Sequence, residues 1–484
     1  PTSIPETSVM ALKGPGVPSK GMPRSRARSM EPSANAAEDR AKQASPETLS
    51  LHGPYGNIQA AIRKLSAQCA RYRDERLKFV QDIIYFGRRI PTVVTQRRMN
   101  LEKVVAARAA WEKANEQLHK PADAPPAARL REAGAVLVTE TTMPDYGMLS
   151  SGLSSVHHLS RNPWDLSKTP GGSSAGAGSA AAAGYGPLHV GTDIGGSIRL
   201  PAGWCGVFGL KPSLGRVPID PPYMGRAAGP MTRSVSDAAL MLQVLAQPDA
   251  RDSMSLPAQQ LSWAGVADTP VEHLKGLSIG LLLDAGCGLP VDPQVTAAVQ
   301  AAAQLLESAG ARITPMRPFF TREMLDGLDH FWRMRSYIDL QALSPAQREK
   351  LLPFIRRWAE SAAAFDGPHV FRAYAQTHAT RVAAVAASAP FDCVISPVAP
   401  NLPALAEDPS PTNDPLRPLE HIAFTVPWNM SEQPAASINC GYSASGLPIG
   451  LQIAGARFDD VGVMRVARAF EQLRGPQRPW PQPQ

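Results

Sequence analysis

The sequence predicts a single large α/β domain in which a mixed β-sheet core is covered by helices on both faces. Helical and strand-like segments alternate from about residue 124 onward, which is the pattern of layered α/β proteins. Most of the strand-like segments are short apolar runs, as expected for strands buried on both faces. The chain has 484 residues, 44% hydrophobic and 19% charged, which is an ordinary globular balance with ample length for a large core.

The first expected elements surround a run of very small residues. Residues 128–134 end a helix at a glycine, and residues 135–141 form a strand. Residues 175–186 form a helix made almost entirely of Ala and Gly, and residues 188–192 form the next strand. Residues 234–246 form a helix with Ser and Asp near its start, which are residue types that cap helices.

The second half continues the alternation. Residues 277–284 form a strand, and residues 292–310 form a long helix that ends in glycine. The remaining expected elements are strands over 393–398, 435–440 and 448–455 and a last helix over 460–473.

Basic charge is concentrated in the first quarter of the chain. Residues 1–123 hold 21 Lys and Arg and 12 Asp and Glu, a net charge of +9, whereas residues 124–484 carry −2. This asymmetry disfavours nucleic acid as a partner of the main body and leaves only a basic N-terminal arm as a candidate.

The composition of the chain also divides it into regions. Residues 1–50 are rich in Pro, Ser, Ala and Arg and are predicted to be a low-complexity, disordered basic segment. Residues 51–120 are predicted to be helical, because residues 56–90 and 101–119 have apolar positions at helical spacing. Residues 476–484 form a tail rich in Pro and Gln.

The cysteines suggest a reducing environment. Cys69, Cys205, Cys287, Cys393 and Cys440 are scattered and form no CxxC pair, so neither a zinc site nor a disulfide framework is indicated. We therefore expect a cytoplasmic protein. No apolar run reaches ~18 residues, which predicts no transmembrane helix, and the first residues lack the layout of a signal peptide.

Three glycine-rich segments carry the candidate chemistry, at residues 170–178, 191–201 and 206–216. Glycine permits positive φ and lets the backbone approach a ligand closely. The Gly-Gly pair directly before Ser197 can present successive N–H groups around one point, which can hold a developing oxyanion. Serine is a weak nucleophile without a base, so the motif still needs one.

Other interpretations of these segments are weaker. A single Gly/Ser run is usually a turn, and the phosphate-loop pattern GxxxxGK[ST] is absent. Residues 172–176 match the nucleophile elbow G-x-S-x-G, with Ser174 as the nucleophile. That elbow requires a strand directly before it, and Pro170 interrupts the preceding stretch, so we do not expect an α/β-hydrolase elbow here.

Together the three segments resemble the amidase signature family. The resemblance rests on GGSSAG followed by GTDIGGSIRLPAGWCGVFGLKP, with a spacing of 24 positions between Ser173 and Ser197. Flanking stretches such as NPWDLSKTPGG and FDCVISPVAP are also similar, so the amidase signature domain is expected over residues 121–475. The resemblance implies a large mixed sheet wrapped by helices, a small-molecule amide substrate, no metal or organic cofactor, and a homodimer.

The resemblance also implies roles for individual residues. Ser197 is the nucleophile, and Ser173 is the bridging serine that follows a cis peptide bond from Gly172. The family uses no catalytic histidine, so His157, His158 and His189 are expected to be structural or exposed. The implied oxyanion hole comprises the backbone N–H groups of Ile194, Gly195, Gly196 and Ser197.

The sequence departs from the family pattern at the base, which in the family is a lysine followed by Asp and held neutral by burial. None of the 12 lysines here precedes an aspartate. Lys103 is the nearest by spacing, 70 positions before Ser173, but its surroundings are helical and charged. Lys20 has only a faint local similarity, so neither is assigned as the base, and Lys211 is expected to be structural.

The leading hypothesis is an amidase that hydrolyses a carboxamide C–N bond to a carboxylate plus ammonia or an amine through a serine acyl-enzyme. One alternative is the glutaminase (A) subunit of a tRNA-dependent amidotransferase, a member of the same family. Another is a non-catalytic family member that lacks its lysine base. Two explanations compete for the departure at the base: the N-terminal quarter is foreign to the family, or the base has moved to another lysine.

Overall fold

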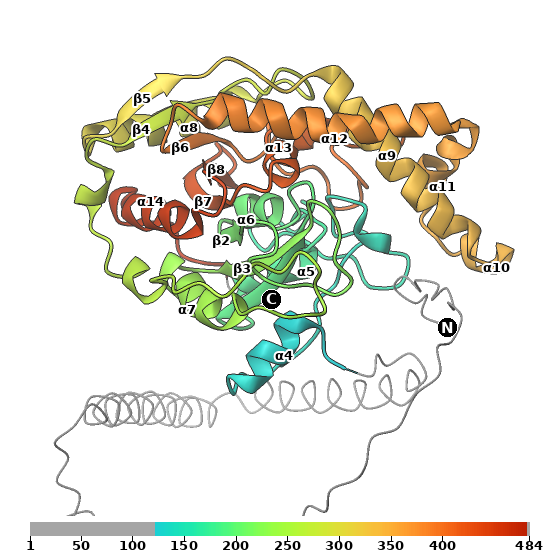
Figure 1. The fold of residues 1–484 in the computed structure, drawn as a ribbon, viewed down its shortest axis with the longest axis horizontal. Coiled ribbons are helices and arrows are strands. Elements are labelled where there is room, and N and C mark those ends of the chain that lie inside the picture. Colours follow the sequence, from blue (N-terminus) through green and yellow to red (C-terminus); the bar gives the residue numbers. More distant parts are fainter. Residues whose placement is uncertain (1–121, 482–484) are drawn as a thin grey trace, which may run out of the picture. The chain divides into compact units, whose positions relative to one another are not determined.

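The structure is a computed structural model that describes residues 122–481 (Figure 1). The predictions for residues 1–121 lie outside the described residues. They include the helices expected over 56–90 and 101–119, as well as Lys20 and Lys103. The boundaries proposed for the N-terminal regions therefore stay predictions.

An eight-stranded mixed sheet forms the centre of the part of the chain that the structure describes. The strand order is β1-β3-β2-β7-β8-β6-β4-β5. Neighbours from β1 to β6 in this order are antiparallel, whereas β6–β4 and β4–β5 are parallel. The strands are β1 (Leu188–Asp193), β2 (Phe208–Lys211), β3 (Ala227–Thr232), β4 (Ser278–Leu281), β5 (Arg312–Pro315), β6 (Cys393–Pro397), β7 (Ala435–Tyr442) and β8 (Pro448–Gly455).

One face of the sheet is covered by α7 (Val235–Leu245), α8 (Pro293–Ser308) and α14 (Asp460–Leu473). Their apolar stripes and the sheet bury one large core between them, which is the main source of stability in such a layer. Each helix begins at a polar residue whose side chain accepts a backbone N–H, which satisfies a donor that the helix leaves unpaired. These N-caps are Ser234, Asp292 and Asp459.

The opposite face is covered by α5 (Ala175–Ala183), α6 (Arg199–Cys205) and α13 (Val426–Met430). The approach of α6 to the sheet depends on glycine at both contact points. A Cβ on Gly450 of β8 would lie 2.7 Å from the Cα of Gly203, so a side chain there would push the helix away. This close packing fixes the position of the loop that precedes α6.

A third layer lies outside this face. There α9 (Arg322–Gln341) packs against α12 (Gly367–Ser388), which runs along the upper edge of Figure 1. The remaining helices are α4 (Pro125–Glu132), α10 (Pro345–Arg348) and α11 (Pro353–Glu360), with short 3-10 turns η2 (Asp145–Gly147), η3 (Ala264–Val266), η4 (Val271–Leu274), η5 (Ser361–Ala364) and η6 (Glu420–Ile422). The predicted fold class, a mixed sheet with helices on both faces, is confirmed.

Most of the predicted elements within the described residues are confirmed to within a few residues. The exception is residues 135–141, which the sequence predicts as a strand and which are irregular in the structure. Val136 is 85% exposed and Val138 is 71% exposed, so the apolar alternation there does not reflect burial. The pattern indicates strand propensity, but propensity alone does not supply a buried face.

The end of the chain is anchored by an aromatic residue. The Trp480 ring lies beneath the Arg233 guanidinium, 4.6 Å from ring centroid to Cζ, and 6.0 Å from the ring of Trp164. The segment predicted as a tail is therefore held on the domain as far as residue 480.

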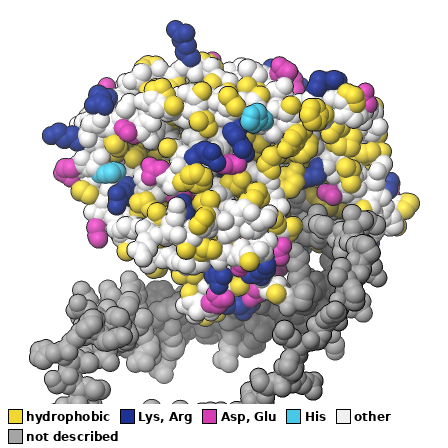
Figure 2. Space-filling view, viewed as in Figure 1, with side chains coloured by type: hydrophobic (Ala, Val, Ile, Leu, Met, Phe, Trp, Pro, Cys, Tyr) yellow, Lys and Arg dark blue, Asp and Glu magenta, His cyan; other side chains and the backbone are white. Residues whose placement is uncertain are grey.

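The surface agrees with the charge distribution of the body. On the face shown in Figure 2, basic and acidic side chains are interspersed, and no single large basic patch is present on it. Among the helices of residues 122–481, none is both long and apolar enough to cross a membrane.

Candidate active site

The loop that carries Ser197 connects β1 to α6. The strand ends at Asp193 and the helix begins at Arg199, so residues 194–198 form a tight turn above the sheet, with Ser197 half-buried. Gly196 has φ +131°, and a Cβ there would lie 2.7 Å from Thr425 Oγ1. Only glycine fits this backbone and this contact.

The four backbone donors predicted for the oxyanion hole do not behave alike. Within residues 122–481, the N–H groups of Ile194, Gly195 and Ser197 have no hydrogen-bond acceptor. The Gly196 N–H donates to Asp193 Oδ1 at 2.8 Å. The structure therefore leaves three of the predicted donors available to a ligand, whereas the fourth, the Gly196 N–H, is already hydrogen-bonded to Asp193.

That carboxylate organises the whole turn. The guanidinium of Arg199 binds it with two hydrogen bonds, from Nη2 to Oδ1 at 2.8 Å and from Nε to Oδ2 at 2.9 Å. The backbone N–H of Ile198 donates to Oδ2 at 3.1 Å. Asp193 and Arg199 are both 0% exposed, so this is a fully buried and well-paired ion pair beneath the turn.

The ion pair is extended by three neutral side chains, Thr425, Asn429 and Gln452. Asn429 Nδ2 donates to Asp193 Oδ1 at 2.9 Å, and Arg199 Nη1 donates to Gln452 Oε1 at 2.8 Å. Thr425 Oγ1 donates to the carbonyl of Gly195 at 2.6 Å, which ties the network directly to the turn. We call these five residues (Asp193, Arg199, Thr425, Asn429 and Gln452) the floor network.

The charge of Asp193 is maintained by these partners. Burial by itself raises the pKa of the carboxyl group, but the charge of Arg199 and hydrogen bonds from Arg199 and Asn429 outweigh burial and lower the pKa to about 2. The carboxylate therefore stays ionised and keeps its hold on the turn at any pH near neutrality.

Ser173 lies beside the same turn. It is 5% exposed, and the peptide bond from Gly172 to Ser173 is cis, as the family resemblance implies. The N–H of Ser174 donates to the carbonyl of Ser197 at 3.3 Å, so the two serine segments lie side by side. A Cβ on Gly147 would be 3.5 Å from Ser173 Oγ, which places η2 over this serine.

The hydroxyl of Ser174 is used for structure. It accepts the N–H of Thr192 at 3.1 Å and donates to the carbonyl of Thr192 at 3.1 Å, which ties the start of α5 to β1. The residues before Ser174 form no strand. Both observations agree with the expectation that Ser174 is not an elbow nucleophile.

Among the four lysines of the described residues, only Lys211 is buried, at 1% exposed. Its Nζ donates to the carbonyl of Pro212 at 2.9 Å. Burial and the nearby charge of Arg199 lower its pKa to about 7. No lysine within residues 122–481 is hydrogen-bonded to Ser173 or Ser197, so the described residues do not place a base on either serine.

The side of the turn away from the floor network is bordered by residues that sequence reasoning did not identify. A Cβ on Gly195 would lie 3.2 Å from Ile422 Cδ1 and 3.4 Å from the ring of Trp332 on α9. Next to Trp332, Arg335 contacts Met148 and stacks on Tyr223. We call Met148, Tyr223, Trp332, Arg335 and Ile422 the rim.

The other residues considered from the sequence have structural roles. His157 and His158 are exposed, and His189 is half-buried with Nε2 3.1 Å from the carbonyl of Gly186. Cys205 is fully buried in the core, and burial raises the pKa of its thiol. These findings confirm the expectations for the three histidines.

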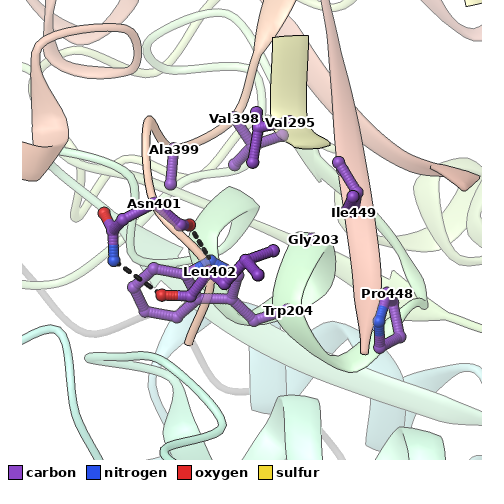
Figure 3. Close-up of a pocket in the computed structure, with 10 residues that line it drawn as sticks. Gly203, Trp204, Val295, Val398, Ala399, Asn401, Leu402, Pro448 and Ile449 are labelled. Carbon is purple, nitrogen blue, oxygen red and sulfur yellow. Dashed lines mark hydrogen bonds between the residues drawn. The ribbon is translucent and has the colours of Figure 1, made fainter. Parts of the chain in front are cut away.

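A small pocket beside α6 is not the site. Its volume is about 10 Å³, room for one water at most, and it is lined by residues such as Trp204, Asn401 and Ile449 (Figure 3). The indole N–H of Trp204 donates to the carbonyl of Asn401 at 3.1 Å across it. None of the predicted site residues lines this cavity.

The fold and the turn together define a class: an α/β protein in which a serine adjoins a glycine turn with backbone N–H groups available to an anion. A family model described as Amidase matches residues 105–464. The chain belongs to the amidase family.

Curated relatives and solved structures agree with this assignment. The glutamyl-tRNA(Gln) amidotransferase (A) subunit of Synechococcus sp. (strain CC9605) is 33% identical over 389 residues, covering 74% of this chain and 77% of that protein. Its counterpart in Myxococcus xanthus (strain DK1622) is 35% identical over 393 residues, covering 72% and 77%. A bacterial aryl acylamidase of the amidase signature family superposes with a TM-score of 0.66 at 27% identity, covering 73% of this chain and 76% of that one.

Proposed function

We propose that this member of the amidase family hydrolyses a carboxamide C–N bond through an acyl-enzyme on Ser197. Ser197 Oγ attacks the carbonyl carbon, and the N–H groups of Ile194, Gly195 and Ser197 accommodate the oxyanion that forms. The C–N bond then breaks, and the amine leaves with a proton relayed through Ser173. Water hydrolyses the ester to release the carboxylate and to restore the serine.

The observation that carries this proposal is the set of three unpaired N–H groups beside a half-buried serine within the described residues. Such donors act best when they are held rigidly before the charge develops, and here the floor network holds them from below. Removing one donor of an oxyanion hole typically costs about 3 kcal/mol of barrier stabilisation.

The proposal also requires a base for Ser173. No lysine within residues 122–481 is hydrogen-bonded to either serine, so the described residues leave the base of the relay unassigned. Lys103 is the nearest candidate by spacing. The proposed organisation is an amidase signature domain over residues 121–475.

The relatives support a second candidate, the glutaminase subunit of a tRNA-dependent amidotransferase. Two similar curated proteins, at 33% and 35% identity, are amidotransferase subunits of this kind by name. This function predicts glutamine as the substrate and stable partner subunits. Purification as a lone homodimer with no glutamine hydrolysis would count against it.

The deciding experiment measures ammonia or aniline release by the purified full chain from a panel of aliphatic and aryl amides, with glutamine included. Wild type is compared with Ser197→Ala and with Ser174→Ala as a matched control, since both variants remove one hydroxyl from the same turn region. Turnover that falls at least a thousandfold in Ser197→Ala and stays within about tenfold of wild type in Ser174→Ala supports the proposal.

Two other outcomes are informative. Full activity of Ser197→Ala would overturn the assignment of the nucleophile. A folded wild-type protein that binds amides without turnover would favour the non-catalytic alternative, in which the serine and the anion hole remain but the base is missing.

A further inference from the structure

An arginine lies on the rim of the site without a strong hydrogen-bond acceptor among the described residues. Arg335 is on α9, three residues after Trp332, so both side chains lie on the same face of the helix. Trp332 borders the nucleophile turn at Gly195, with 3.4 Å between its ring and a Cβ built on that glycine. The face of α9 that carries Arg335 therefore faces the same side of the site as Trp332.

The guanidinium of Arg335 lies where two further segments of the site meet. Its Nη2 is 3.0 Å from the thioether sulfur of Met148, which follows the glycine that covers Ser173. Its Cζ lies 4.9 Å from the ring centroid of Tyr223. Tyr223 belongs to the loop whose Gly225 carbonyl accepts a hydrogen bond from Asn429 of the floor network.

These neighbours do not satisfy a cation. A thioether is a weak acceptor, and an aromatic face takes the plane of the guanidinium rather than its N–H groups. The Nε of Arg335 is buried and has no hydrogen-bond acceptor within the described residues. The guanidinium has five N–H donors, so its capacity to bind a planar anion is largely unused.

The other two arginines of α9 provide the comparison. Arg333 Nε donates to Asp329 Oδ2 at 2.8 Å, and Arg322 binds Glu420 with two hydrogen bonds of 2.8 and 2.6 Å. Both are therefore paired with a carboxylate, as half-buried or buried arginines usually are. Arg335 lies on the same helix as these two arginines, but no carboxylate pairs with it within the described residues.

The nearest acid on the helix does not fill this role. Asp339 lies one turn beyond Arg335 and forms no hydrogen bond or salt bridge with it within residues 122–481. Burial raises the pKa of Asp339, whereas the charge of Arg335 opposes that rise. Arg335 thus affects the pKa of Asp339 through its charge alone, and its N–H groups are not bonded to that carboxyl group.

We propose that Arg335 binds a carboxylate of the substrate, so that this enzyme prefers amides that carry a second, anionic group, such as monoamides of dicarboxylic acids or N-acyl amino acids. A bidentate contact between the guanidinium and the carboxylate fixes the substrate across the rim while its amide lies over Ser197. The inference rests on the proposed amidase function and adds the substrate class to it.

The test compares two chromogenic anilides that differ in one group. Glutaryl-p-nitroanilide ends in a carboxylate, and valeryl-p-nitroanilide has a methyl group in its place. We expect wild type to prefer the glutaryl substrate in kcat/KM and Arg335→Met to reduce that preference about 10- to 100-fold, the range of a charge-assisted hydrogen bond. Arg335→Lys should retain part of it.

A purely structural role of Arg335 gives a different result, because it lowers turnover of both anilides and leaves their ratio unchanged. Arg372→Met is the matched control. Arg372 is an exposed arginine on α12, and its removal tests non-specific attraction of anions at the surface. An unchanged ratio in Arg335→Met, or an equal loss in Arg372→Met, overturns the proposal.

A binding measurement separates this inference from the proposed function. Titration calorimetry compares glutaramate, an amide that carries a carboxylate, with the neutral amide valeramide on the Ser197→Ala protein, with and without Arg335→Met, so that no turnover is needed. Glutaramate binding that is lost with Arg335→Met supports the inference even if no amide is hydrolysed. Equal affinity for glutaramate and valeramide, or glutaramate affinity unaffected by Arg335→Met, contradicts it.

Discussion

The two sides of the turn that carries Ser197 are built in opposite ways. Below the turn, Asp193 and Arg199 are completely buried and bound to each other and to neutral partners at 2.6–3.3 Å. Beside the turn, Arg335 has a thioether and an aromatic ring as neighbours. We infer from this difference that one side fixes the geometry of the proposed reaction, while the other keeps binding capacity for the proposed substrate.

The largest expected change comes from breaking the ion pair of the floor network. Arg199→Met leaves the carboxylate of Asp193 buried without its cation, which typically costs about 3–5 kcal/mol of unfolding free energy. Urea unfolding followed by circular dichroism measures it. Arg335→Met is the control from the rim and should cost about 1 kcal/mol or less. Equal losses in the two variants would contradict the contrast between floor and rim.

The next effect concerns Lys211, which lies buried near the floor network. Its folded pKa of about 7 is below the ordinary value of 10.5, so between these values the unfolded chain binds a proton that the folded chain does not. The unfolding free energy of wild type should therefore rise with pH over this window, relative to Lys211→Met, by about 1.4 kcal/mol for each pH unit. Urea unfolding at several pH values measures the difference.

Lys168→Met is the control for this pH dependence, because Lys168 is only partly buried. If the difference for Lys211→Met does not change with pH over this window, Lys211 is protonated in the folded protein and the account of its burial is wrong.

A smaller change is expected where the floor network touches the turn. Thr425→Val removes the hydrogen bond to the carbonyl of Gly195 and should cost about 1–2 kcal/mol of stability. Because Gly195 supplies one of the three unpaired N–H groups, kcat should also fall about tenfold. Steady-state kinetics beside unfolding curves test both effects.

The matched control is Thr380→Val on α12. Thr380 is 0% exposed, and its hydroxyl donates to the carbonyl of Gln376 at 2.7 Å. The substitution therefore removes a buried hydrogen bond comparable to that of Thr425, but on a different helix. It should reduce stability without reducing kcat. A fall of kcat in both variants would show that the loss follows stability and not the geometry of the turn.

The elements that the sequence predicts well are those with a long apolar pattern. The strand over 448–455 and the helix over 460–473 have the predicted bounds, because the strand is buried along its length, the helix has a regular buried stripe, and both end at clear breaks. The strands β2 and β3 were not predicted. They are short and glycine-containing, and only their pairing with neighbouring strands makes them strands.

The candidate site divides in the same way. The segments of Ser173 and Ser197 could be chosen from the sequence, because their glycine patterns are local and the family resemblance covers both. Thr425 and Arg335 could not, since only the fold brings these distant positions to the turn. The engagement of the Gly196 N–H by Asp193 depends on the detailed path of the turn, which no residue pattern specifies.

The most direct test of the central claim asks which serine reacts. A fluorophosphonate probe forms a covalent phosphonate ester with an activated serine and releases fluoride, and peptide mass spectrometry locates the adduct. The account predicts one adduct on Ser197 in the full chain, its loss in Ser197→Ala and its persistence in Ser174→Ala. An adduct on Ser174, or labelling that survives in Ser197→Ala, would contradict the claim that the turn above the floor network holds the nucleophile.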